Sequence, residues 1–148
     1  MARMLNRAII DVIVAYRQIG VFDRDLYEGL PTPNQSKGSW LRAGTASVLL
    51  ALGEDVGPSL FTLELWDVEP SPLDHLDWSV SEVVDLEFPS GWLCVEMLSG
   101  GSLSDVFNVG APGRYSARFA WRENPDWIDP DSEGPEAFLV AQFWQKAT

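Results

Sequence analysis

WSVSEVVDLEF, residues 78 to 88, alternates apolar and polar side chains along most of its length. One set of alternate positions holds Trp78, Val80, Val84, Leu86 and Phe88, and the other holds Ser79, Ser81, Asp85 and Glu87. Successive side chains of a β-strand point to opposite faces of a sheet. The pattern therefore predicts a strand with one face in the core and the other in water.

Three strand pairs are predicted from this stretch and its surroundings. Residues 89–91, Pro-Ser-Gly, are typical of a turn, and the apolar run WLCVEML follows them. A second pair of runs flanks the turn sequence EDVGP, and a third flanks the acidic stretch DWIDPDSEGPE. Two such runs joined by a turn or short loop predict a hairpin. The predicted pairs are 78–88 with 92–98, 46–53 with 59–67, and 114–123 with 136–145.

The N-terminal third adds a strand and a long connection. The run AIIDVIVAY, residues 8–16, is rich in β-branched side chains, and VFD, residues 21–23, is expected to continue it or pair with it. Residues 23–39 are expected to form a long connection with one short helical turn. The Ala and Leu residues of 46–53 also suit a helix, but the run is short and precedes a turn, which favours a strand.

Together these runs give about eight strands with turns between neighbours. Such a succession predicts an all-β fold, either an antiparallel β-sandwich or a Greek-key barrel. The chain has 148 residues, and a domain of this size buries roughly two thirds of its unfolded surface. We therefore expect a single domain over residues 1–148.

The composition favours a folded cytoplasmic protein. With 46% hydrophobic and 22% charged residues, the chain is too apolar to stay disordered. Asp11 interrupts the apolar run near the N-terminus, and no small-residue cleavage site follows, which argues against a signal peptide. A membrane span would need about 18 consecutive apolar residues, and the sequence contains no such run. Cys94, the single cysteine, cannot form an internal disulfide.

The net charge of −12 is concentrated in the middle of the chain. Residues 43–113 contain no Lys or Arg and twelve acids, whereas the two flanks carry ten acids and ten bases. A negative surface repels nucleic acids and lipid headgroups and accelerates the approach of a basic protein. The same charge could serve only solubility. We expect a basic protein partner, and neither nucleic acid nor membrane.

The stretch DWIDPDSEGPE, residues 126–136, holds five carboxylates and lies in the loop of the third predicted hairpin. DPDSEG resembles the first half of a calcium-binding loop, but Val140 stands where the closing glutamate is needed, and Pro130 restricts the backbone. No metal site is therefore predicted. The remaining interpretations are a solvated loop and a docking loop in which Trp127 and Ile128 supply apolar anchors.

Enzyme chemistry is not indicated by any motif. A nucleophile would need His75 next to Cys94 or a serine, and Cys94 lies in an apolar run that is typical of a buried thiol. Structural zinc needs four N or S ligands, whereas the chain has one His and one Cys. We predict no catalysis and no cofactor. Trp40, Trp66 and Trp92 could form a platform for a sugar or a base, but core packing is the favoured interpretation.

Three phrases resemble the competence protein J (ComJ) type of small bacterial β-sandwich. They are IVAYRQIGVFD at 13–23, VDLEFPSGWLCV at 84–95 and VGAPGRYSARFAW at 109–121, and the closing FLVAQFWQ extends the similarity over most of the chain. The founding member of that family is an intracellular inhibitor of a nuclease of DNA uptake. The resemblance implies a binding protein without catalysis. The acidic middle and the N-terminal MARMLNR depart from the family pattern.

The predicted function is that of a cytoplasmic, non-catalytic inhibitor or immunity-type protein that places an acidic sheet face on a basic partner such as a nuclease. The alternatives are a sandwich that binds a small ligand or sugar, and a structural subunit of a larger assembly. An apolar patch ringed by acids would favour a protein partner, and exposed tryptophans on a concave face would favour a ligand. The predicted partner-binding residues are Glu64, Trp66, Asp85, Glu87, Trp127, Asp129 and Asp131.

Overall fold

The computed structural model describes residues 1–15, 17–26, 40–52, 57–73, 78, 80–97 and 101–146. These ranges contain ten β-strands and no helix. The strands are β1 (Met4–Val14), β2 (Gln18–Asp23), β3 (Leu41–Ala43), β4 (Ser47–Ala51), β5 (Gly57–Trp66), β6 (Val80–Phe88), β7 (Trp92–Met97), β8 (Gly101–Asn108), β9 (Gly113–Glu123) and β10 (Ala137–Gln145). The helical turn expected within 23–39 falls largely on residues outside the described ranges.

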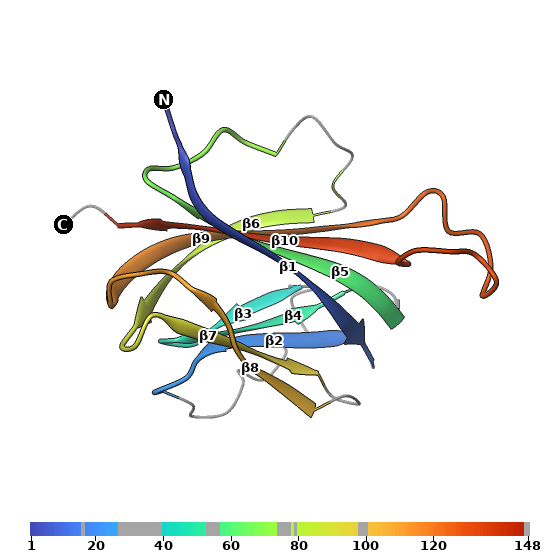
Figure 1. Ribbon diagram of the computed structural model, residues 1–148, viewed down its shortest axis with the longest axis horizontal. Helices are drawn as coiled ribbons and strands as arrows, with labels where there is room; N and C mark the ends of the chain where they lie inside the picture. Colours follow the sequence, from blue (N-terminus) through green and yellow to red (C-terminus); the bar gives the residue numbers. More distant parts are fainter. Residues whose placement is uncertain are drawn as a thin grey trace.

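The strands form two five-stranded sheets stacked as a sandwich (Figure 1). Sheet A has the strand order β1-β5-β10-β9-β6, and sheet B has the order β3-β4-β2-β7-β8. Neighbouring strands are antiparallel except β5 and β10, which run parallel. The prediction of an all-β sandwich is confirmed. The described part of the chain also holds two strands that the sequence did not predict, β3 and β8.

Only one of the three predicted hairpins forms. β9 and β10 pair from Ala137↔Glu123 to Gln145↔Tyr115, as expected. The pairing of β4 with β5 and that of β6 with β7 were predicted wrongly, because each connection crosses from one sheet to the other. β1 and β2 also lie in different sheets and are linked by an isolated bridge from Ala15 to Gln18. A strand of a sandwich buries one face whichever strand lies beside it, so alternation alone does not reveal its partner.

A buried carboxylate holds the crossing from β6 to β7. Asp23, which is 0% exposed, accepts hydrogen bonds from the backbone N–H groups of Ser90 at 3.1 Å and Gly91 at 3.0 Å. It also accepts from the Ser90 hydroxyl at 2.8 Å and from the N–H of Asp25 at 2.8 Å. Gly91 has a φ of +81°, and a Cβ atom there would lie 3.0 Å from the carbonyl oxygen of Gly110. The turn therefore needs both Asp23 and a glycine.

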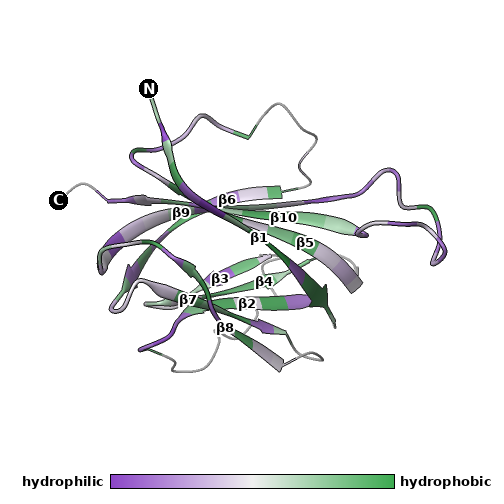
Figure 2. Cartoon of the chain, viewed as in Figure 1, coloured by the Kyte–Doolittle hydropathy of each residue, from purple (hydrophilic) through white to green (hydrophobic). Residues whose placement is uncertain are grey.

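Aromatic side chains fill the core between the sheets. Phe143 of β10 lies within 6.2 Å, between ring centroids, of Phe88, Phe107 and Phe119. Tyr115 is buried beside Phe88 and donates its hydroxyl proton to the carbonyls of Val109 and Ala111. Figure 2 shows hydrophobic colours along the central strands and hydrophilic colours on the connections. Four apolar residues of β6 face this core as their alternation predicted: Val80, Val84, Leu86 and Phe88.

Cys94 is buried, as the apolar run around it predicted. Burial raises the pKa of its thiol, which makes the thiol less reactive. Among the described residues there is no helix that is both long and apolar enough to span a membrane.

Candidate functional site

Four of the predicted partner-binding residues share the outer face of sheet A. Glu64 and Trp66 lie on β5, and Asp85 and Glu87 lie on β6 at the opposite side of the sheet. Their side chains point away from the core, as their positions in the strands predicted. Because β10 and β9 separate β5 from β6, the four residues form two groups and not one patch.

Glu64 and Trp66 are held inside a cavity. The indole Nε1 of Trp66 donates a hydrogen bond of 3.0 Å to Oε1 of Glu64. The side-chain amide of Gln142, which is 4% exposed, donates a second one of 3.0 Å to the same oxygen. Both Glu64 and Trp66 are half-buried and line the cavity above the sheet. Neither side chain is a freely projecting anchor.

Asp85 and Glu87 are exposed but lie next to bases. Nζ of Lys146 is 2.7 Å from Oδ2 of Asp85, and the hydroxyl of Ser116 donates to Oδ1 at 3.1 Å. The hydrogen bond from Lys146 lowers the pKa of Asp85 below its ordinary value, with Ser116 as the second cause. Arg114 is the register partner of Glu87 on β9, and both residues line the same small hollow.

Bases from the flanks of the sequence lie against acids from its middle, so the outer face of sheet A carries charges of both signs. Arg118 pairs with Glu69 at 3.3 Å, and Lys146 pairs with Asp85. A third such pair joins Arg24 to Asp105 at 3.4 Å. The charge that is segregated along the sequence is therefore partly balanced in space.

The loop between β9 and β10 projects from one end of the sandwich and keeps its own structure (Figure 1). The Ser132 hydroxyl accepts hydrogen bonds from the N–H groups of Ile128 at 2.9 Å and Asp129 at 3.1 Å. Oδ1 of Asp129 accepts from the N–H of Asp131 at 2.9 Å, so Asp129 starts a turn as predicted. Asn124 closes the base of the loop through the carbonyl of Pro135 at 2.8 Å.

This loop presents acids around an apolar residue. Ile128 is 83% exposed, and Trp127 beside it is half-buried. Four carboxylates of the loop are exposed: Asp126, Asp129, Asp131 and Glu133. Within the described ranges, no group of three His, Cys, Asp or Glu residues could hold a metal ion. The loop has the composition of a docking element, with an apolar contact amid charge.

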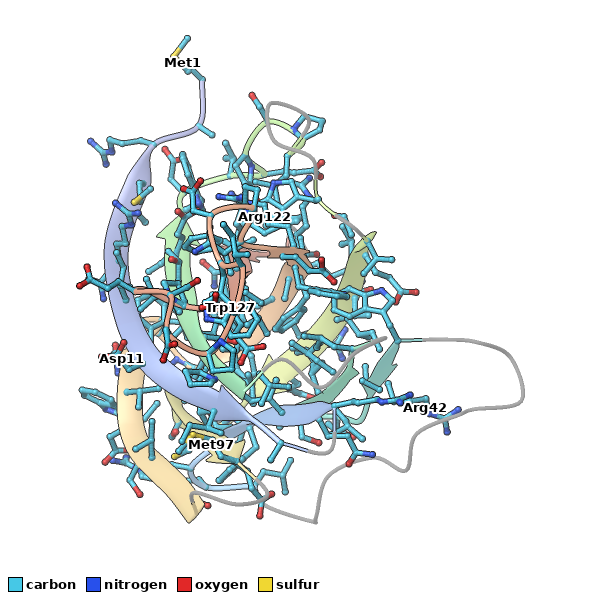
Figure 3. All side chains as sticks on the ribbon, turned by 90° about the vertical axis from the view of Figure 1, so that its right-hand side faces the viewer. Met1, Asp11, Arg42, Met97, Arg122 and Trp127 are labelled. Atoms are coloured by element: carbon cyan, nitrogen blue, oxygen red, sulfur yellow. The ribbon has the colours of Figure 1, made fainter. Side chains whose placement is uncertain are left out.

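An apolar hollow of about 580 Å³ adjoins the base of the loop. Ile13 and Met97 line it together with Leu60 and Pro135, and the backbone N–H of Ile13 contacts the Sδ of Met97 at 3.2 Å. Asp11 lies at the same hollow and is exposed. Figure 3 looks onto this end of the molecule and labels Asp11, Met97 and Trp127. We refer to the apolar hollow and the acidic loop together as the docking surface, which is a candidate site for a protein partner.

The sequence analysis did not predict the apolar hollow of the docking surface. Ile13 and Met97 come from β1 and β7, which lie in different sheets. A sequence signal did exist, because the run AIIDVIV of β1 is apolar at positions of both parities, and Ile9 and Ile13 are 53% and 44% exposed. A strand at a sheet edge with apolar residues on its outer face is typical of an interaction site.

The fold of the chain is similar to that of small β-sandwich proteins whose structures have been solved. No family model and no curated protein matches the sequence. The crystal structure of ComJ from Bacillus subtilis, an inhibitor of the DNA-degrading activity of NucA, matches over 99% of both chains, with a TM-score of 0.71 and 11% identity. A second structure, crocagin biosynthetic gene J, matches over 97% of this chain and 100% of its own, with a TM-score of 0.53 and 21% identity. The chain therefore has the ComJ-like fold.

Proposed function

We propose that the protein is a non-catalytic, cytoplasmic inhibitor or immunity-type protein that binds a basic protein such as a nuclease. The observation that carries the proposal is the match to ComJ, an inhibitor of a nuclease, over 99% of both chains. The docking surface adds independent support, because it combines an apolar hollow with exposed acids, which is the arrangement expected for a protein partner.

The two parts of the docking surface would have different roles in binding. Exposed carboxylates of the loop attract a basic partner over a distance that salt limits to about 10 Å at 0.1 M. Ile128 and the apolar hollow lose water on contact, which slows dissociation. A nuclease is a suitable partner because its cleft is built to hold a polyanion.

The proposed contact includes Trp127, Asp129 and Asp131. It leaves out Glu64 and Trp66, because the two residues already hydrogen-bond each other inside a cavity. It also leaves out two acids of β6 that lie beside bases, Asp85 and Glu87.

The test is capture of nuclease activity from a lysate of the native host. The wild-type protein is immobilised beside two double variants, one with Ile128→Ala and Asp131→Lys, the other with Val83→Ala and Glu82→Lys. The second variant is the matched control, because Val83 is 50% exposed and Glu82 is an exposed acid on β6, away from the docking surface. Lysate is applied at low salt, and the proteins released at high salt are assayed for DNA degradation.

Wild type and the β6 variant should retain a DNA-degrading activity that free wild-type protein inhibits, and the loop variant should retain little of it. Failure of the wild type to retain any such activity would contradict the nuclease as partner. Equal retention by both variants would show that the partner binds elsewhere.

A further inference from the structure

A second cavity, of about 640 Å³, lies on the outer face of sheet A. Its floor comes from β1, β5, β10 and β9, and the connection that follows β5 covers it through residues 70–73 and Trp78. In Figure 1 the first part of this connection, residues 67–73, passes over the side of sheet A that faces away from sheet B. Binding sites for small molecules have volumes of about 300 to 1,000 Å³. The cavity is therefore large enough for a small organic ligand.

Arg118 connects the cover of the cavity, residues 70–73, to the strands that form its floor. This side chain is 6% exposed, and its Nη1 donates hydrogen bonds to the carbonyls of Pro70 at 3.3 Å and Ser71 at 3.2 Å. The same nitrogen donates to Oε1 of Gln142 at 3.0 Å, and Nη2 pairs with Glu69 at 3.3 Å. Because one buried side chain contacts both the cover and the sheet, the cavity is a preformed feature of the fold.

The apolar part of the lining is aromatic. Trp66, Trp78 and Phe138 all line the cavity. The guanidinium of Arg122 lies 4.4 Å from the ring centroid of Phe138 and 5.7 Å from that of Trp78. Aromatic faces and a stacked guanidinium are surfaces on which a flat ring packs well.

The polar part of the lining has more free donors than acceptors. Among the described residues, no carboxylate forms an ion pair with Arg7 or Arg122, and both line the cavity. The buried Nε of Arg122 and Nε1 of Trp78 have no hydrogen-bond partner among the residues that the structure describes. The acid in the described lining, Glu64, already accepts two hydrogen bonds at one oxygen. Buried donors without acceptors are rare in folded proteins, so the guanidinium of Arg122 retains hydrogen-bonding capacity that the described residues do not use.

We propose that this cavity binds a small organic anion with a flat aromatic body. Its carboxylate accepts hydrogen bonds from Arg122 and is attracted by Arg7, and its ring packs beside Trp66, Trp78 and Phe138. Arginine suits this role because its planar donors match a carboxylate in a two-bond geometry. The nearby carboxylate of Glu64 disfavours ligands with several negative charges. This site is separate from the docking surface and does not depend on the proposed function.

Three probes of the same shape test the proposal by isothermal titration calorimetry: 2-naphthoate, 2-naphthamide and 2-naphthylmethylammonium. The wild-type protein should bind the carboxylate about tenfold or more tightly than the neutral amide, because the charge-assisted hydrogen bonds are lost with the amide. The cation should show no binding. Equal affinities for carboxylate and amide, or no binding of the carboxylate at millimolar concentration, would overturn the proposal.

The Arg122→Met variant keeps the apolar stem beside Phe138 and removes the charge. It should weaken binding of 2-naphthoate about tenfold and leave binding of 2-naphthamide unchanged. Arg42→Met, at an exposed position of sheet B, is the matched control and should bind both probes as the wild type does. If Arg122→Met does not fold, the exposed Arg7→Gln replaces it, with a loss of several-fold expected for the carboxylate alone. An unchanged preference for the carboxylate in the folded variant would contradict the site.

Discussion

Asp23 and Ser90 are 67 residues apart in the sequence, and the hydroxyl of Ser90 donates a 2.8 Å hydrogen bond to the buried carboxylate of Asp23. Asp23 ends β2 of sheet B, and Ser90 lies in the turn through which the chain passes from sheet A to sheet B. The carboxylate thus fixes the point at which the two sheets are joined. The N–H of Gly91 donates to the same carboxylate at 3.0 Å.

Asp23→Ala should lower the free energy of unfolding by about 2 to 4 kcal/mol, because donors in the turn lose their acceptor in a buried place. Urea unfolding followed by tryptophan fluorescence measures this loss. Asp25→Ala is the control: Asp25 is exposed, and the variant should lose less than about 1 kcal/mol. Similar losses in both variants would show that the buried carboxylate does not hold the turn.

Tyr115 should make stability fall at alkaline pH. Burial raises the pKa of its phenol above the ordinary value, which is 10.0. The folded state therefore favours the protonated phenol, and this contribution is complete below the pKa of the unfolded tyrosine and is lost as the pH rises through the folded pKa. Tyr115→Phe should be less stable than wild type at pH 8, and the difference should narrow above about pH 10. A difference that stays constant from pH 8 to pH 11 in urea unfolding would contradict this.

Arg118→Met should release the cover of the sheet A cavity. The carbonyls of Pro70 and Ser71 and the amide oxygen of Gln142 lose their donor, with an expected cost of about 2 to 3 kcal/mol. Chymotrypsin should then cleave faster after Leu73, which is half-buried in the cover. Arg114→Met, at an exposed position of the same strand, should change neither stability nor cleavage. Cleavage at the wild-type rate in Arg118→Met would mean that other contacts hold the cover.

The strands were easier to predict from the sequence than their partners. β6 buries one face, and Tyr115, Ala117, Phe119 and Trp121 of β9 occupy alternate positions, so alternation identified both strands. The β9–β10 hairpin was predicted correctly because the two strands follow each other in the sequence and are neighbours in sheet A. The turn after β6 has the composition of a hairpin turn but leads into the other sheet, held there by Asp23. That bond joins residues far apart in the sequence, and local composition does not reveal it.

The candidate site was also predicted only where its residues are close together in the sequence. The acidic loop with Trp127 and Ile128 is continuous in the sequence, so it was found there. The apolar hollow brings Ile13 together with Met97, and the sheet A cavity brings Arg7 together with Arg122. Trp78 was placed on the core side by alternation, but it precedes β6 and lines the outer cavity. The two cavities and the outward position of Trp78 depend on contacts between residues far apart in the sequence, which a local pattern does not show.

The most direct test of the proposed function is the rate of DNA cleavage by the captured nuclease as wild-type protein is added. Cleavage should fall to near zero at equimolar protein and recover in part as salt rises, because salt screens the attraction of the acidic loop. The Ile128→Ala, Asp131→Lys variant should need a much higher concentration, whereas the Val83→Ala, Glu82→Lys variant should inhibit as the wild type does. Cleavage that continues unchanged at a large excess of wild-type protein would contradict the inhibitor function.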